Sequence, residues 1–344
     1  MSNPKKSKKN GVRTLAESTG LSIATVSRVL NNSPLVSEKS RALVLEHMQK
    51  TGYVPNSAAR ALATNRTKII GAVIPTVDHS IFSRFIHAIE SELSESGYAL
   101  VLAITGFDQD NELRRANELI HMGAEGLILS GAVHKPELLE LIKAAGVPVL
   151  FSSVHESLDK DIPAIGYDNQ QLAYSATEYL ASHHHKHLAV IHGPEGQSDR
   201  TALRIKGVRQ YAETFGLTVD YIEQELSVAG GVIGAKEVFT QEALPDAIMC
   251  TSDIMALGVM FEASRAGVVI PQDMSLMGFD NLDWAELSNP PLTTIRLPSW
   301  QMGVSVARAM VEFLEEGRPI SSLTLHGRLC ERGTVQVRGE KNKI

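Results

Sequence analysis

The sequence predicts two parts of different fold class: an N-terminal all-α module and an α/β body made of two doubly wound parallel-sheet lobes. The chain has 344 residues, 43% of them hydrophobic, which is too long for one compact core and enough for two or three domains. From Thr67 onward, short apolar runs typical of buried strands alternate with amphipathic helical segments. The first 66 residues show only the apolar periodicity of short helices.

The charge of the chain is divided unevenly between these parts. Residues 1–66 hold eleven Lys or Arg and three acidic residues, a net charge of +8, whereas the remainder carries −14. A basic module on an acidic body suggests a polyanion as partner of the module alone. No apolar run reaches the roughly 18–20 residues of a membrane helix. The basic start lacks the apolar stretch of a signal peptide. Only two cysteines occur, Cys250 and Cys330, which excludes a disulfide framework, so we expect a cytoplasmic protein without membrane contact.

Two short helices open the basic module. The first is expected over Arg13–Thr19 and ends at Gly20, which takes a positive φ at little cost. Ser22 is placed to cap a second helix over Ile23–Asn31. Apolar residues at i, i+3 and i+4 spacing give this helix a buried stripe, formed by Val26, Val29 and Leu30.

A third helix is expected after Ser37, with Leu43, Val44 and Met48 completing the small core. Two helices joined by a glycine turn could form a purely structural corner. However, the second helix leaves a small, polar and basic face free, which is what entry into a DNA major groove requires. We therefore predict a helix-turn-helix module.

The pieces LAE, G-L-S and TVSRVLN in residues 14–31, and GYVPN further on, resemble the DNA-binding headpiece of the LacI/GalR family of transcriptional regulators. The resemblance implies that Ile23 and Ala24 are the variable base-reading positions; both are apolar, which favours thymine methyl contact or shape readout. Arg28 would face guanine or phosphate, the alternative being a solvated helix charge. The other implied DNA contacts, mainly phosphate-positioning residues, are Thr14, Ser22, Thr25, Ser27 and Asn31.

A hinge helix over about residues 56–64 is implied next. Pro55 breaks the third helix and Asn56 can cap an alanine-rich segment that is too short to be stable alone. In the family this helix folds on DNA and pairs with its dimer mate over the minor groove. Leu62 would wedge into the central base step, and Asn56 and Ala59 match the hinge as well. The alternative is that Leu62 packs on the body.

The body shows two similar series of elements. The first series predicts strands over residues 69–75, 99–105, 126–130 and 148–151, and helices over 82–96, 111–122 and 136–145. The second predicts helices over residues 172–183, 202–215, 235–240 and 255–266, and strands over 188–192, 247–250 and 275–279. A late helix over residues 302–316 is expected to return to the first lobe. Two such lobes bind ligands in the cleft between them, at the carboxyl ends of the strands.

The segments GVPVL, IGYDN, SDIMALG, MGFDN and PPLTTIRLP occur in the order of the family's periplasmic-binding-protein-like core. We expect a headpiece over residues 1–66 and a body over 67–340. The first lobe would cover about 67–166 and 297–326, and the second about 167–296 and 327–340. A homodimer formed mainly by the first lobe is implied, because the C-terminal residues lack the apolar heptads that accompany tetramers in the family.

Four residues are expected to line the effector cleft. Phe82 follows the first strand, Asp280 follows a later one, and Arg204 begins an R-x-x-G step that ends at Gly207. Arg200 and Arg204 stand four apart near a helix start, where backbone N–H groups favour anions. A buried Arg and Asp would bind hydroxyl groups by charge-assisted hydrogen bonds. Either could instead form an interlobe salt bridge without a ligand.

A sugar acid or sugar phosphate is the favoured effector. A neutral sugar would leave one of the two arginines without a counter-charge in a desolvated site. The stretch DRTALRIKG, with IGYDN upstream, is also similar to the gluconate-responsive branch of the family.

Other features are expected to carry no chemistry. His183 and His187 have the i, i+4 spacing of metal ligands, but the tract lies at a helix end where histidine is also favoured by the helix dipole. The glycines 230, 231 and 234 match no phosphate-binding motif and are expected in a loop beside the cleft. Nothing pairs a nucleophile with a base. We expect no metal, no cofactor and no enzymatic activity.

The leading interpretation is a dimeric, effector-responsive repressor of carbohydrate or sugar-acid metabolism genes that binds double-stranded operator DNA. A sugar-binding or sugar-modifying protein without DNA function is the alternative, but the basic three-helix module has no use there. A co-regulator controlled mainly by a partner protein is a third interpretation. Whether a ligand releases the protein from DNA or strengthens binding stays open.

Overall fold

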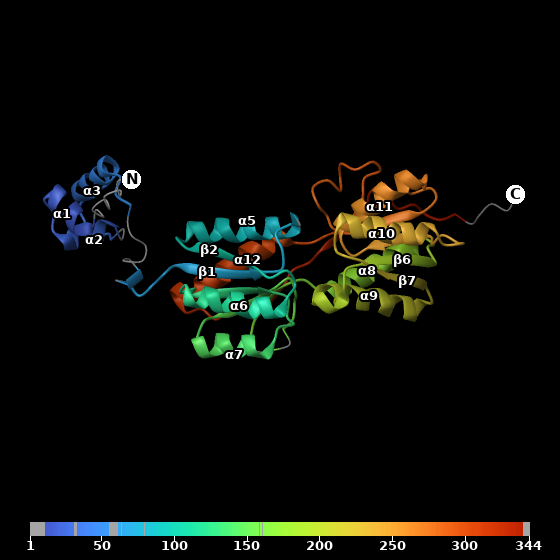
Figure 1. Cartoon of the computed structure of the whole chain (residues 1–344), viewed down its shortest axis with the longest axis horizontal. Coiled ribbons are helices and arrows are strands. Elements are labelled where there is room, and N and C mark those ends of the chain that lie inside the picture. Colours follow the sequence, from blue (N-terminus) through green and yellow to red (C-terminus); the bar gives the residue numbers. More distant parts are fainter. Residues whose placement is uncertain are drawn as a thin grey trace, which may run out of the picture. The chain divides into compact units, whose positions relative to one another are not determined.

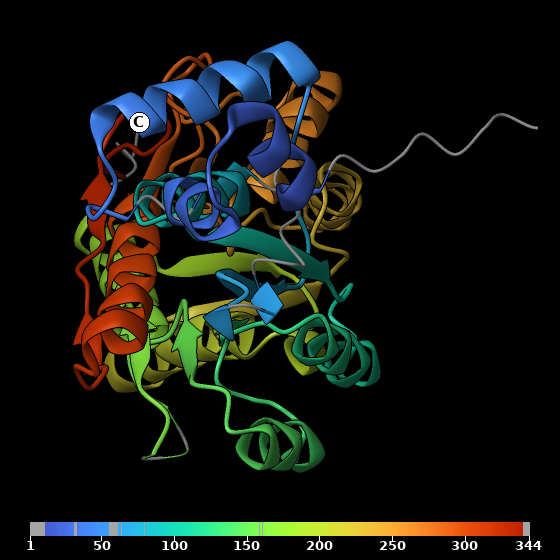
Figure 2. The ribbon, with the colours of Figure 1, turned by 90° about the vertical axis from the view of Figure 1, so that its left-hand side faces the viewer.

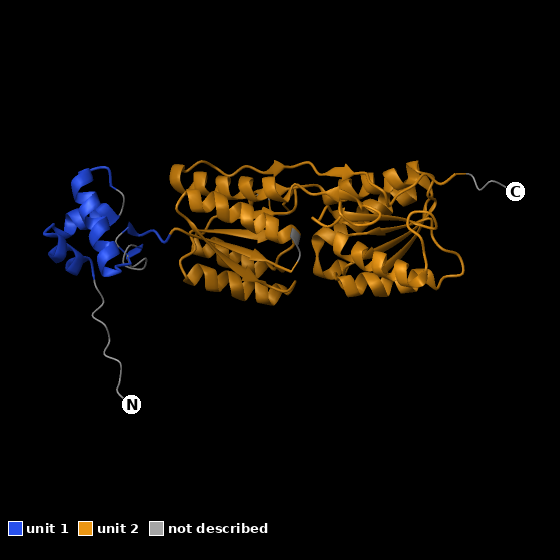
Figure 3. Ribbon diagram, turned by 90° about the horizontal axis from the view of Figure 1, so that it is seen from above, with its two compact units in different colours: residues 1–67 blue, residues 68–344 orange. Residues whose placement is uncertain are grey.

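The computed structural model describes residues 11–30, 33–54, 61–62, 64–78, 80–157, 159 and 161–339. The chain divides into two compact units, Met1–Thr67 and Lys68–Ile344 (Figure 3). In the described part of the chain, no helix combines the length and hydropathy needed to cross a membrane.

The first unit contains the three helices predicted from the sequence, α1 (Val12–Thr19), α2 (Ile23–Leu30) and α3 (Glu38–Thr51) (Figure 2). The Ser22 hydroxyl accepts a hydrogen bond from the Thr25 N–H at 3.1 Å and so caps α2. The core of this three-helix unit consists of six buried side chains: Leu15, Ala16, Val26, Val29, Val44 and Tyr53. Leu43, expected in this core, does not belong to it, and Tyr53 takes part instead.

The first lobe of the second unit is a six-stranded sheet in the order β11-β5-β4-β3-β1-β2. All of its strand pairs are parallel, and the strands are β1 (Ile69–Ile74), β2 (Ala99–Ile104), β3 (Gly126–Ser130), β4 (Val149–Ser152), β5 (Ala164–Gly166) and β11 (Leu323–Thr324). Helices α5 (Ser80–Glu95) and α12 (Ser299–Glu316) pack on one face, and α6 (Gln109–His121) and α7 (Pro136–Ala145) on the other (Figure 1).

The second lobe repeats this plan with the strand order β12-β10-β9-β8-β6-β7. Only β12 runs antiparallel to its neighbour among these strands, which are β6 (His187–His192), β7 (Thr218–Glu223), β8 (Ala247–Cys250), β9 (Ser275–Asp280), β10 (Thr293–Arg296) and β12 (Arg328–Cys330). Helices α8 (Asn169–Ser182) and α9 (Asp199–Phe215) cover one face, and α10 (Val228–Phe239) and α11 (Asp253–Ala266) the other. The predicted fold class, an N-terminal all-α module and a body of two doubly wound lobes, is confirmed.

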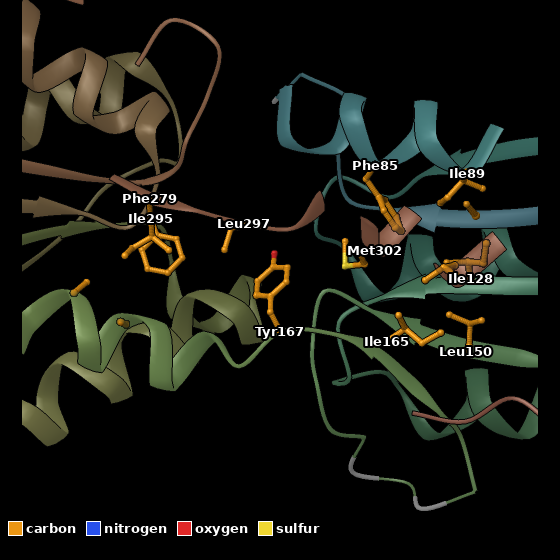
Figure 4. Close-up of a cluster of buried hydrophobic side chains, with 14 of the residues drawn as sticks. Phe85, Ile89, Ile128, Leu150, Ile165, Tyr167, Phe279, Ile295, Leu297 and Met302 are labelled. Atoms are coloured by element: carbon orange, nitrogen blue, oxygen red, sulfur yellow. The ribbon is translucent and has the colours of Figure 1, made fainter. Parts of the chain in front are cut away.

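One hydrophobic cluster joins the two lobes. It contains Phe85 and Met302 of the first lobe and Phe279 of the second. Tyr167 and Leu297, on segments that cross between the lobes, lie between these two groups (Figure 4). The crossing segments therefore form part of the core, and a change in the angle between the lobes must repack them.

The glycines 230, 231 and 234 do not form a loop, so that expectation was wrong: they lie inside α10. A Cβ atom at Gly231 would overlap the carbonyl oxygen of Met255, and one at Gly258 would overlap that of Val228. The two helices α10 and α11 thus approach so closely that only glycine fits at the crossing. The glycine cluster that suggested a loop therefore allows the close packing of two helices.

Two histidines of the tract, His185 and His187, make structural contacts. His185 is 1% exposed, and its ring is held between the Leu180 carbonyl at 2.9 Å and the Ser275 hydroxyl at 2.8 Å. His187 contacts Asp220 at 2.7 Å. No group of three or more His, Cys, Asp or Glu side chains in the described ranges is arranged to hold a metal ion.

Candidate effector cleft and DNA-binding face

The free face of α2 carries the residues expected to contact DNA. Val26 and Val29 are turned into the core, while Ile23 is 49% exposed and Ala24 and Arg28 are exposed. The exposed face of α2 therefore carries two apolar side chains, Ile23 and Ala24, and the cationic side chain of Arg28. The remaining expected residues lie nearby in the chain: Thr14 and Ser22 are exposed, and Thr25 and Ser27 are half-buried.

The hinge is described only in part. Leu62 is 88% exposed, which leaves a large apolar side chain in water. Asn31, Asn56 and Ala59, three of the expected DNA contacts, lie outside the described residues.

The second unit contains two neighbouring cavities between its lobes. The smaller, which we call the inner pocket, has a volume of about 50 Å³, and all four expected effector residues line it, namely Phe82, Arg200, Arg204 and Asp280. One water needs about 10–15 Å³ of such volume, so the inner pocket holds a few waters but no sugar in this conformation.

Arg204 lies one turn into α9, and its guanidinium group contacts several neighbouring residues of the second lobe. Its Nη1 atom lies 3.6 Å from Oδ1 of Asp280 and donates to the Thr251 carbonyl at 2.6 Å, while its Nε donates to Asn169 at 3.0 Å. Its guanidinium also lies 4.0 Å from the ring centre of Phe279. The sequence analysis gave a salt bridge between the lobes as the alternative role of Arg204 and Asp280. The two residues do form a salt bridge, but it lies within the second lobe and does not cross the cleft.

Asp280 ends β9 in a backbone conformation that is costly for a residue with a side chain, with φ at 118°. Its Oδ2 accepts a hydrogen bond from the Ser252 hydroxyl at 2.7 Å. Strain of this kind persists only where surrounding contacts impose it, and it concentrates at functional sites. Burial, and then the charge of the nearby Asp280, raise the pKa of Asp253 to about 7.

Arg200 lies on the boundary between the two cavities and lines both. Its side chain is 11% exposed, and its Nη1 lies 3.2 Å from Oδ1 of Asp199. That buried Nη1 atom makes no hydrogen bond to the described residues. Asp199 also accepts a hydrogen bond across the cleft from the Ala132 N–H at 2.6 Å. It therefore ties α9 to the loop after β3 in the first lobe.

These pairings correct one argument from the sequence. A neutral sugar was expected to leave one arginine without a counter-charge. That is wrong for this conformation, because Arg204 is paired with Asp280 and Arg200 with Asp199. The geometry could not be foreseen because Arg204 and Asp280 are brought together by tertiary structure alone.

Sequence reasoning missed several residues of the inner pocket. Thr251 and Ser252 follow β8, as Asp280 ends β9, so the rule that ligands bind at strand carboxyl ends could have found them. The Thr251 side chain is buried, and its hydroxyl makes no hydrogen bond to the described residues. A buried polar atom in this state indicates a missing partner at the pocket.

The larger cavity, which we call the outer chamber, has a volume of about 840 Å³ and is lined from both lobes. It shares Phe107, Ser198 and Arg200 with the inner pocket. A volume of this size is typical of small-molecule sites.

A helix-turn-helix module joined to a two-lobed body with a ligand-sized cleft defines a small-molecule sensor that acts on DNA. Residues 67–326 match the periplasmic binding proteins and sugar binding domain of the LacI family, and residues 13–56 match the bacterial regulatory proteins of the lacI family. The chain belongs to the LacI family.

Relatives support the same assignment over nearly the whole chain. The transcriptional regulator GntR of Escherichia coli K12 is 30% identical, over 96% of this chain and 100% of its own. Catabolite control protein A of Priestia megaterium is also 30% identical, over 90% and 94% of the two chains. A structure of the lac repressor dimer bound to operator and the anti-inducer ONPF has a TM-score of 0.85 at 25% identity, covering 96% and 100%. The protein is a DNA-binding transcriptional repressor with an effector-binding domain, and its relatives are regulators rather than enzymes.

Proposed function

We propose that this repressor acts in the cytoplasm as a homodimer on a pseudo-palindromic operator and controls genes of sugar-acid metabolism. One recognition helix reads one half-site, so two copies are needed to read both. In this proposal Ile23, Ala24 and Arg28 contact bases, and Leu62 wedges into the central step. The remaining expected residues of the headpiece hold the phosphates.

The effector in this proposal is a sugar acid or sugar phosphate, with gluconate as the first candidate. The observation that carries it is the buried Nη1 atom of Arg200, which makes no hydrogen bond to the described residues in the first turn of α9. The backbone N–H groups of a helix start add a favourable field for an anion at that place. A carboxylate or phosphate would supply the missing acceptor.

The hydroxyl groups of such a ligand would reach the Asp280 and Ser252 side chains and the Thr251 hydroxyl. Because the inner pocket holds only a few waters, the ligand must first move the lobes apart there. That motion would break the hydrogen bond from Ala132 to Asp199 and repack the crossing segments around Tyr167. A changed angle between the lobes would separate the hinge helices and weaken operator binding.

Calorimetry tests the proposal, with gluconate, related aldonates, sugar phosphates and neutral hexoses as ligands. Arg200→Gln is the variant of choice, because Arg204 also holds Asn169 and Asp280 in place. We expect an anion to bind the wild type and to bind the variant about tenfold or more weakly, the loss of one charge-assisted hydrogen bond. Arg209→Gln, on the exposed side of α9, is the matched control. Tight binding of a neutral sugar that survives Arg200→Gln would contradict the anion proposal.

A further inference from the structure

The outer chamber differs in charge from the inner pocket. Among the described residues that line it, Arg200 and Lys206 are cationic, and His155 lies 3.6 Å from carboxylate oxygens of Glu156 and Asp168. Six carry carboxylates: Asp108, Glu112, Glu156, Asp168, Glu195 and Asp199. Of these, Asp199 is paired with Arg200, Glu112 contacts His134 and Glu195 contacts Arg209. A cavity of this balance attracts cations and repels the anion proposed for the inner pocket, because field lines are focused in a low-dielectric cleft.

Two of these carboxylates come from opposite sides of the cleft. Asp108 caps α6 of the first lobe, where its Oδ1 accepts from the Asp110 N–H at 2.8 Å. Asp168 caps α8 of the second lobe, where its Oδ1 accepts from the Gln171 N–H at 2.8 Å. In both residues the cap uses Oδ1. Oδ2 of Asp108 is not needed for its cap, and Oδ2 of Asp168 lies 3.6 Å from Nε2 of His155, which also lines the chamber. A ligand between the two would bridge the lobes.

Neutral polar groups of the wall are suited to hydroxyls. Side-chain amides both donate and accept hydrogen bonds, as hydroxyl groups do, and five line the chamber: Gln109, Gln170, Gln171, Gln197 and Gln210. Independently of the charges, the Ser130 hydroxyl in this wall is buried and makes no hydrogen bond to the described residues. A buried hydroxyl in that state indicates an absent partner.

We propose that the outer chamber is a second binding site, distinct from the effector pocket, and that it takes an amino sugar. The protonated amine lies between the carboxylates of the two lobes, and the hydroxyls of the ring meet the glutamine amides and Ser130. Phe107, shared by both cavities, offers an apolar surface to the ring face. Because the two sites differ in charge, a sugar acid and an amino sugar do not compete for the same contacts.

The test compares ligands that differ by one group. Binding of glucosamine, galactosamine and mannosamine to the full chain is measured by calorimetry beside their parent hexoses, at a pH where the amine is protonated. At least one amino sugar is expected to bind about tenfold or more tightly than its parent hexose, the effect of one charge-assisted hydrogen bond. Equal binding of each pair, or no binding by any amino sugar, would overturn the proposal.

The double variant Asp108→Asn, Asp168→Asn locates the site. Asparagine caps a helix as well as aspartate does, so both helix starts stay capped while two charges are removed. The preference for the amine is expected to disappear in this variant. Asp110→Asn, in the first turn of α6 but outside the chamber wall, is the matched control and is expected to keep the preference. A preference that persists in the double variant, or is lost equally in the control, would overturn the placement.

The result of the amino-sugar test can be interpreted independently of the effector proposal. Failure of every sugar acid to bind would leave the amine comparison readable, because its variants do not touch Arg200. Thermal unfolding of each variant shows whether it is folded, and the wild-type ligand pairs test the proposal without any variant.

Discussion

The Nη1 atom of Arg204 lies 3.6 Å from Oδ1 of Asp280, and the two side chains are 10% and 7% exposed. A pair buried to this degree is costly to form and far more costly to break. Removing one partner leaves an uncompensated charge away from water, which typically costs about 3–5 kcal/mol. The arginine therefore fixes the shape of the inner pocket as well as its charge.

Arg204→Ala is accordingly expected to lower the free energy of unfolding by about 3–5 kcal/mol. Asn169 and the Thr251 carbonyl would lose their donor at the same time. Denaturant unfolding measures the change. Arg209→Ala, whose side chain is 50% exposed, is the control and should change stability by less than about 1 kcal/mol. A similar, small change in both variants would mean that the pair is not a structural element.

Asp253 is expected to make stability depend on pH. Burial, and then Asp280, raise its pKa from 3.8 to about 7. Between these values the folded chain holds a proton that the unfolded chain has lost, so this residue lowers the free energy of unfolding as pH rises through that window. Asp253→Asn should flatten the curve there, whatever its effect on overall stability. Denaturant midpoints across the window test this, with the exposed Asp161→Asn as control. An unchanged slope would contradict it.

Gly231→Ala is expected to destabilise the second lobe. The new Cβ atom would overlap the Met255 carbonyl, which is backbone and cannot turn aside. Overpacking of this kind costs about 1–3 kcal/mol. Gly196→Ala provides the comparison, because a Cβ atom there meets no heavy atom within 4 Å. Thermal unfolding of the two variants decides whether the close approach of α10 and α11 is required.

Leu62→Ala tests the hinge. A wedging side chain gains from a deformable central base step and gains nothing on an arbitrary sequence. The variant is therefore expected to lose much more affinity for a selected operator than for random DNA, with no loss of folding stability, because Leu62 is 88% exposed. Titration of both duplexes by fluorescence anisotropy measures it. An equal loss on both would show that Leu62 is not a wedge.

Most of the architecture could be predicted from the sequence, because its signals are local. A continuous apolar run such as Leu188–Ile191 marks a buried strand, and Ser22 and Ser37 mark helix starts. Strands β5, β7, β10, β11 and β12 were missed. β5 has only three residues, and the half-buried β7 lacks the continuous apolar run of its neighbours. The glycines in residues 230–234 led to the wrong prediction of a loop, because glycine occurs both in turns and where two helices cross closely.

The site could be predicted as a set of residues but not as a geometry. Arg204 and Asp280 follow from their positions in the chain, yet their mutual pairing depends on how α9 and β9 meet. The separation of the cleft into an inner pocket and an outer chamber, like the cross-lobe hydrogen bond from Ala132 to Asp199, depends on how the two lobes meet. Such contacts between distant segments leave no pattern in a single sequence.

Selection of bound duplexes from a random pool tests the central claim most directly, because it requires no prior operator. The full chain is predicted to enrich a pseudo-palindrome of two half-sites, as a dimer with one recognition helix per half-site does. Arg28→Ala, an exposed change on α2, should lower affinity for that sequence by about 1–3 kcal/mol if the residue reads a base. Enrichment of no sequence, or of one whose binding Arg28→Ala leaves unchanged, would contradict the account of this headpiece.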